Sequence, residues 1–188
     1  MTLFLLFSIL ATTLNCIGWG FYLYGSYKKH IISSQVYLFF SFLMVINNLL
    51  SLHHFASFSL IMSYGVGVLA SIFSLALSFK NPLIFTKKDV FLICFAISLF
   101  LALHFYPTTV LLLTNLYYIV NYFIYILKIQ KKEVQEWYIP WFFWIFTSIF
   151  LFLGLLQSNP ISWISPIINF ICWGGIFILS YRQHLLKK

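Results

Sequence analysis

The sequence predicts an all-α polytopic membrane protein with seven transmembrane helices in a 3+1+3 arrangement. Three observations support this fold class. Of the 188 residues, 62% are hydrophobic and 7% are charged, whereas a soluble domain carries about 25% charged residues. The apolar residues form runs close to the length of about 20 residues that a helix needs to cross a bilayer. The few charged residues lie between these runs, so we expect one membrane domain, residues 1–188, in a bacterial inner membrane.

Charges, prolines and polar clusters bound seven apolar segments, and we expect each segment to be a membrane-spanning helix. They cover residues 2–26, 36–52, 57–79, 89–106, 108–127, 138–157 and 161–181. The first segment follows no basic region and is too long for the apolar core of a secretory signal, so we interpret it as a span. The least marked boundaries are His53-His54, after the second segment, and Pro107-Thr108, before the fifth.

All eleven basic residues lie in alternate connections between these segments or after the last one. They are Lys28 and Lys29; Lys80, Lys87 and Lys88; Lys128, Lys131 and Lys132; and Arg182, Lys187 and Lys188. Asp89, Glu133 and Glu136 share these connections. Because short loops rich in Lys and Arg stay in the cytoplasm, we expect the amino terminus outside and the carboxyl terminus inside. One helix more or fewer would put basic loops on both sides of the membrane.

The net charge of +8 therefore indicates orientation and contact with anionic membrane lipids, and nothing indicates a nucleic-acid partner. The interiors of the expected spans contain no Asp, Glu, Lys or Arg. Proton pumps and ion-coupled carriers place ionisable groups at membrane depth, so this pattern argues against charge-coupled transport. The sequence lacks the G-x-S-x-G and H-E-x-x-H motifs and a glycine-rich phosphate loop. Its cysteines, Cys16, Cys94 and Cys172, show no metal-ligand spacing. We expect no enzyme activity, metal or cofactor.

Self-comparison indicates an internal repeat of three helices. Three residues recur 100 positions later, pairing Asn15 with Asn115, Tyr22 with Tyr122 and Lys28 with Lys128. At an offset of 102 residues, the segment 77–80 matches 179–182. We therefore expect a first triplet over 2–80, a linker helix within 81–107, a second triplet over 108–182 and a basic tail over 183–188. The linker helix would make the two triplets parallel.

The 3+1+3 plan resembles the SWEET and PQ-loop group of membrane proteins along the whole chain. The segment 19–29 resembles the end of a first PQ-loop helix, and Pro140 has a counterpart among the helix prolines of SWEET proteins. The segment Trp141-Phe142-Phe143-Trp144 resembles the W-x-x-W element of PnuC-type nicotinamide riboside uptake proteins. In length and loop layout the chain is also similar to the small YgjV-type inner-membrane proteins. The first two resemblances imply transport by rocking of two helix triplets; the YgjV-type resemblance implies no assigned activity.

Without interior charges, a binding site would consist of amides, hydroxyls and aromatic rings. The candidate residues share a depth near the middle of their spans, and they are Asn15, Asn47, Asn48, Asn115, Trp144 and Asn169. An amide can both donate to and accept from an uncharged solute; alternatively, it bonds one helix to another. Asn169 is preferred because SWEET proteins carry binding Asn residues in the third helix of each triplet. Trp144 lies one turn deeper than Trp141, which fits an interfacial aromatic belt.

A stripe of small residues, Ser59, Ser63, Gly67 and Ser71, recurs at every fourth position. Such a stripe is typical of close helix packing, and a hydroxyl-lined pathway is the alternative. The leading hypothesis is a facilitative transporter of a small uncharged or weakly polar solute, such as a nucleoside, a vitamin or a sugar. The alternative is a non-transporting receptor, sensor or accessory subunit on the same scaffold. The sequence leaves open whether the chain forms a homo-oligomer.

Overall fold

The computed structural model describes residues 3–31, 35–53, 58–78, 87–102, 105–156 and 160–186. These residues form α1 (Leu3–Tyr27), α2 (Gln35–His53), α3 (Phe58–Ser78), α4 (Lys87–Ala102), α5 (Pro107–Gln130), α6 (Tyr138–Gly154), a 3₁₀ turn (Pro160–Trp163) and α7 (Ile164–Leu185). Each helix lies within a few residues of an expected segment. The largest differences are the earlier end of α4, at Ala102 rather than near 106, and the longer carboxyl ends of α5 and α7.

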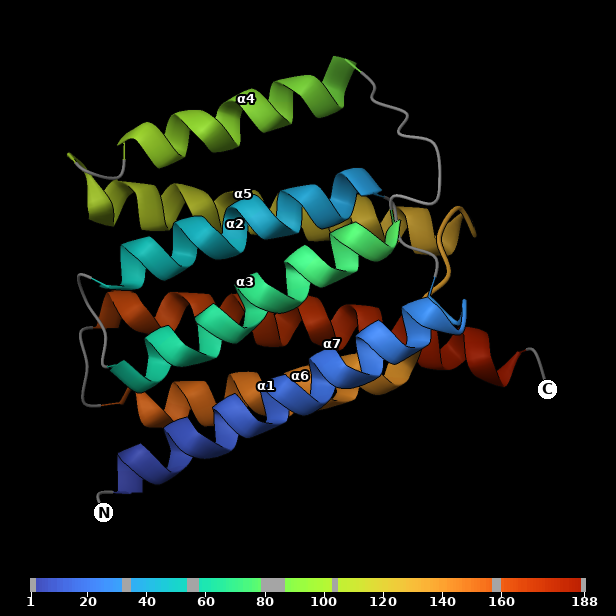
Figure 1. Cartoon of the computed structure of the whole chain (residues 1–188), viewed down its shortest axis with the longest axis horizontal. Coiled ribbons are helices and arrows are strands. Elements are labelled where there is room, and N and C mark those ends of the chain that lie inside the picture. The colour runs from blue at the N-terminus through green and yellow to red at the C-terminus, as the bar shows by residue number, and fades with distance from the viewer. Residues whose placement is uncertain are drawn as a thin grey trace.

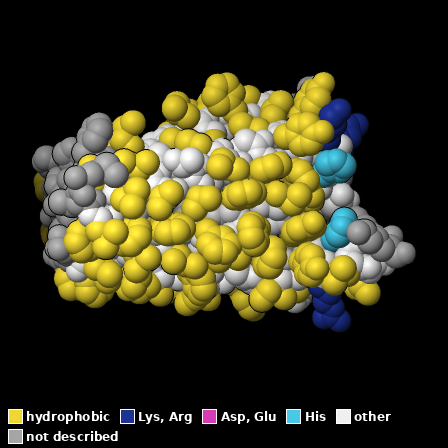
Figure 2. Space-filling view, turned by 90° about the horizontal axis from the view of Figure 1, so that it is seen from below, with side chains coloured by type: hydrophobic (Ala, Val, Ile, Leu, Met, Phe, Trp, Pro, Cys, Tyr) yellow, Lys and Arg dark blue, Asp and Glu magenta, His cyan; other side chains and the backbone are white. Residues whose placement is uncertain are grey.

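Successive helices run in opposite directions along one bundle, and the two termini lie at opposite ends of it (Figure 1). The basic side chains that the structure describes therefore gather at one end, which we call the basic end. They are Lys28, Lys29, Lys128, Lys131, Lys132 and Arg182. Figure 2 shows Lys, Arg and His side chains at this end of one face and many hydrophobic side chains over the rest of that face.

Large apolar side chains point outward along the bundle. Leu69, Phe123 and Ile171 are 61–65% exposed, which is typical of contact with lipid and not with water. Within the described part of the chain, four helical stretches are long and apolar enough to cross a membrane: Leu3–Tyr27, Ile61–Ser78, Thr108–Gln130 and Pro160–Leu185. The apolar α6 is shorter, at 17 residues. These helices fit an integral membrane protein.

The helices pack in an order that differs from their order in the sequence. In the first half, α3 lies between α1 and α2; in the second half, α7 lies between α5 and α6. Across the bundle, α1 packs against α6, which is the most extensive contact, and α2 packs against α5. Helix α4 packs on the outside against α2 and α5.

The first helix ends in a Schellman turn, in which a left-handed residue reverses the chain. Lys29 takes this conformation with φ 59°. The N–H of Lys29 donates to the Ser26 carbonyl over 3.2 Å, and the N–H of His30 donates to the Gly25 carbonyl over 2.8 Å. The turn directs Ile31 back into the core, where it is buried.

Helix α5 ends in the same way. Lys132 has φ 60°, its N–H donates to the Ile129 carbonyl over 3.0 Å, and the Glu133 N–H donates to the Lys128 carbonyl over 3.0 Å. Val134 then turns inward and is buried. Both turns carry their lysine at the negative end of the helix dipole, where a cation is stabilised.

Candidate functional site

A cavity lies in the middle of the bundle. Its lining comes from α1, α2, α3, α5, α6 and α7, and from no described side chain of α4. Its volume is about 80 Å³, which is room for several water molecules. The lining is mostly apolar, with a few amides and hydroxyls among aromatic rings, as is usual for sites that bind small molecules.

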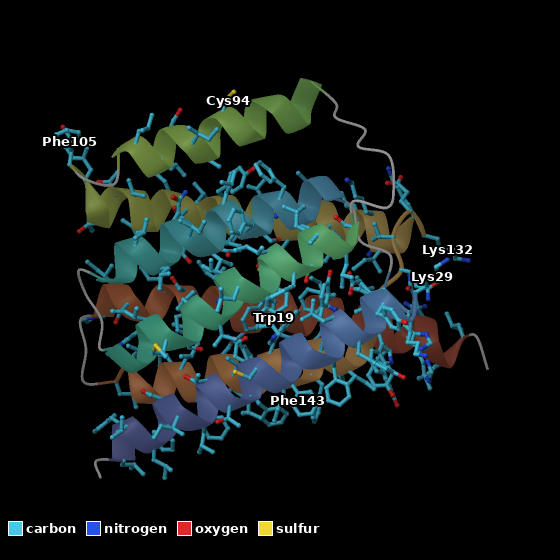
Figure 3. All side chains as sticks on the ribbon, viewed as in Figure 1. Trp19, Lys29, Cys94, Phe105, Lys132 and Phe143 are labelled. Atoms are coloured by element: carbon cyan, nitrogen blue, oxygen red, sulfur yellow. The ribbon has the colours of Figure 1, made fainter. Side chains whose placement is uncertain are left out.

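One wall of the cavity is an aromatic cluster around Trp144 of α6. The Trp144 ring lies 4.8 Å from that of Trp19 and 4.9 Å from that of Trp141, both in edge-on arrangements. Tyr22 and Trp173 complete the cluster, with ring centroids 5.5 and 5.8 Å from Trp144. Figure 3 shows Trp19 extending from α1 into the bundle. Trp144 is only 4% exposed, and its indole N–H has no hydrogen-bond partner among the described residues.

The other wall carries small and polar groups. The Asn15 amide nitrogen donates to the Ser63 carbonyl over 2.8 Å, which ties α1 to α3, and both residues line the cavity. Asn169 of α7 is buried and also lines the cavity. Its side chain lies beside the hydroxyl of Tyr64, as does that of Ser165. The amides of Asn15 and Asn169 therefore reach the same space from the two halves of the chain.

Two tyrosines of α5 also line the cavity. Tyr118 and Tyr122 lie one turn apart, and their rings stack with centroids 5.6 Å apart. The Trp173 N–H donates to the Tyr122 hydroxyl over 2.6 Å. This bond fixes two lining rings relative to each other across the α5–α7 contact.

Three of the predicted site residues, Asn15, Trp144 and Asn169, line the cavity. Asn47 is buried away from it and donates to the Ala96 carbonyl over 3.3 Å, joining α2 to α4. Asn115 is also buried away from it and donates to the Leu111 carbonyl of its own helix over 2.8 Å. Asn48 belongs to α2, but its side chain lies outside the described part of the chain.

The structure also bears on the sequence interpretation of the other tryptophans and of the small-residue stripe. Trp141 is 2% exposed and lines the cavity, so it does not belong to a lipid-facing belt. Trp163 donates to the Leu155 carbonyl over 2.6 Å and closes the turn before α7. In the small-residue stripe, Ser63, Gly67 and Ser71 line the cavity. The side chains of Ser59, His53, His54 and His104 lie outside the described residues.

The sequence interpretation missed the tyrosines and one carboxylate. Tyr118 and Tyr122 have the i, i+4 spacing of one helix face, which was a usable signal. The sequence gives no such signal for Glu136, because this residue lies in a basic connection, where a solvated charge is expected. It is instead 6% exposed. Its carboxylate accepts hydrogen bonds from the Tyr125 hydroxyl and, over 2.9 Å, from the Trp141 indole.

No known protein family, curated protein or solved structure matches the chain.

Proposed function

We propose that the protein is a facilitative transporter of a small uncharged or weakly polar solute, with seven spans in a 3+1+3 plan. The observation that carries this proposal is the central cavity, which is lined by all six helices of the two proposed triplets. A site between two such halves is what a carrier needs, because rocking of one half against the other exposes the site to each side in turn.

The packing order of the helices supports a duplicated plan. If α1, α2 and α3 correspond to α5, α6 and α7, each contact within the first triplet has its counterpart in the second. The contact of α1 with α6 then corresponds to that of α5 with α2. Helix α4 has no counterpart, as expected for a linker. The helix ends agree, because Lys29 and Lys132 form the same Schellman turn.

The cavity lining supports the same correspondence, residue by residue. Six lining positions of the first half recur in the second, at an offset of 103 for α1 and α2 and of 102 for α3. The pairs are Asn15 and Tyr118, Trp19 and Tyr122, Leu38 and Trp141, Ser41 and Trp144, Gly67 and Asn169, and Ser71 and Trp173. In this register the counterpart of Asn15 is Tyr118, whereas the sequence identities had favoured Asn115.

The chemistry of the lining favours an uncharged solute. No Asp, Glu, Lys or Arg is among the described residues that line the cavity, so a charged solute would lose its hydration without an opposite charge to replace it. Asn15 and Asn169 offer both donors and acceptors, and Trp144 offers an indole N–H. The aromatic wall supplies flat apolar area. A nucleoside, a vitamin or a sugar-like solute fits this combination of groups.

The basic end is proposed to face the cytoplasm, with the amino terminus outside, because Lys and Arg gather there. The shorter helices are compatible with spanning. At 1.5 Å per residue, α4 and α6 extend about 24 and 26 Å, and a bilayer thins locally around a short span at modest energetic cost.

Binding can be measured as thermal stabilisation of the purified full chain. A nucleoside, a pyridine vitamin and a monosaccharide are added separately, because a ligand at 100 times its Kd stabilises the folded state by about 2.7 kcal/mol. We expect one class to raise the unfolding temperature and to enter proteoliposomes containing the protein. If no class raises it, the carrier proposal fails and a non-transporting module is favoured.

A matched pair of variants locates the binding. Gly67 lines the cavity, and a Cβ there would lie 3.3 Å from Val45 and 3.8 Å from the Trp19 indole nitrogen. A Cβ at Gly65 would meet nothing within 4 Å. We expect Gly67→Leu to abolish the ligand-induced shift and Gly65→Leu to retain it. An equal shift in both variants would place binding outside the cavity.

A further inference from the structure

A buried carboxylate lies between the central cavity and the basic end of the bundle. Glu136 belongs to the connection between α5 and α6, in which Lys131, Lys132 and Glu133 are exposed. Glu136 is only 6% exposed. A carboxylate leaves water at a large cost unless protein donors replace the lost hydrogen bonds, so its burial indicates a specific role for its partners.

Two of its partners come from α5 and α6. The Tyr125 hydroxyl of α5 donates to one carboxylate oxygen, and the Trp141 indole of α6 donates to the other over 2.9 Å. Both donors are almost fully buried, at 1% and 2% exposure. Hydrogen bonds to a carboxylate are roughly twice as strong as those between neutral groups. Glu136 therefore ties the end of α5 to the beginning of α6.

Trp141 connects this tie to the cavity. Its ring lines the cavity and packs against Trp144, while its N–H is held by Glu136 on the side of the basic end. Ile31, Ile129 and Val134 are buried in the same apolar cluster as Tyr125 and Trp141. A carboxylate and this cluster thus separate the cavity from the basic end.

Among the described residues, this tie is found in one half of the bundle only. The cavity-lining counterpart of Trp141 in the first half is Leu38, and a leucine side chain has no hydrogen-bond donor. The first half therefore has no equivalent anchor at this position. Opening at the basic end would depend on whether the single bonded tryptophan stays in place.

We propose that Glu136 is a positioning residue that latches a gate at the basic end of the cavity. While its carboxylate holds Tyr125 and Trp141, the Trp141 ring closes the cavity on this side. When the tie is released, the ring turns away and the cavity opens to the basic end. The proposal rests on the proposed carrier function, in which the cavity opens alternately to the two sides.

The gate can be tested without a solute, through the accessibility of one cysteine. The background replaces Cys16, Cys94 and Cys172 with alanine and introduces Ser41→Cys, at a cavity-lining position. A membrane-impermeant maleimide is applied to inside-out and right-side-out vesicles. A separate Lys132→Cys chain, labelled at an exposed residue, identifies which vesicles present the basic end.

We expect Glu136→Ala to speed labelling at least tenfold from the basic end and to leave the rate from the other side unchanged. A loss of general packing would speed labelling from both sides, so the asymmetry separates a gate from a structural role. Glu133→Ala is the matched control: it removes an exposed carboxylate of the same connection and should change neither rate. Equal rates in the Glu136 and Glu133 variants, or acceleration from both sides, would overturn the proposal.

Trp141→Phe keeps the result decisive if Glu136→Ala does not fold. It retains an aromatic ring but removes the donor to Glu136, so we expect faster labelling from the basic end alone; an unchanged rate would again overturn the latch. The carrier proposal fails separately, through the absence of ligand-induced stabilisation, because the labelling requires no solute. An opening gate without any ligand response would indicate a gated cavity that does not serve transport.

Discussion

Trp144 occupies the middle of the bundle because α1 leaves room for it at Gly18. The glycine is buried, and a Cβ added there would lie 2.6 Å from the indole nitrogen and 2.7 Å from the neighbouring ring carbon. Real Cβ atoms do not approach so closely. The absence of a single methyl group thus allows the most extensive helix contact, that of α1 with α6, to include the central ring of the aromatic wall.

We expect Gly18→Ala to destabilise the protein by about 1–3 kcal/mol, the usual cost of overpacking a core. Gly20→Ala, two residues further along α1, adds a Cβ that meets nothing within 4 Å. Since alanine has the higher helix propensity, this control should have unchanged or slightly raised stability. Thermal unfolding in detergent, followed by tryptophan fluorescence, measures both variants. Equal unfolding temperatures would show that Trp144 adapts without cost.

Helix α4 depends on few neighbours, because it packs against α2 and α5 on the outside of the bundle. Asn47 provides a polar link, from its amide nitrogen to the Ala96 carbonyl of α4. Asn115 is a similarly buried amide, but its donor is used within α5. The same residue type therefore stabilises an interhelical contact in one case and satisfies a local carbonyl in the other.

Removal of the Asn47 amide should weaken the attachment of α4. We expect Asn47→Ala to lower the free energy of unfolding by about 0.6–2 kcal/mol more than Asn115→Ala does, which is the range for hydrogen bonds between membrane helices. Both variants remove the same atoms from a buried site, so the difference isolates the interhelical bond. Unfolding in detergent at increasing denaturant concentration measures it. An equal loss in both variants would contradict the assignment.

The proposed orientation of the whole molecule rests on the basic end. Its charges lie after α1, in the last turn of α5 and just after it, and near the end of α7, and Figure 3 shows Lys29 and Lys132 at the same end. If this end is cytoplasmic, a periplasm-dependent phosphatase fused after Lys132 should be inactive, and one fused after Leu156 should be active. A cytoplasm-dependent fluorescent reporter at the same positions should give the opposite pattern. Active phosphatase after Lys132 would reverse the proposed orientation.

The sequence by itself determined the helices and the collection of charge at one end. Both are local properties. An apolar run that is long enough to cross the bilayer becomes a helix, because a helix satisfies its own backbone hydrogen bonds. Charged residues lie at the boundaries between such runs. The expected segments therefore differ from the described helices by only a few residues at most ends.

Only the tertiary structure decided which polar groups share the cavity. Lipid and protein interior are about equally apolar, so an apolar membrane helix carries little sequence information about its inward face. Packing turned Asn15 and Asn169 toward the cavity, Asn47 toward α4 and Asn115 back onto its own helix. It also folded a basic connection inward, so that Glu136 is buried against Tyr125 and Trp141. Such rotations and reversals depend on contacts between distant segments, which no single segment encodes.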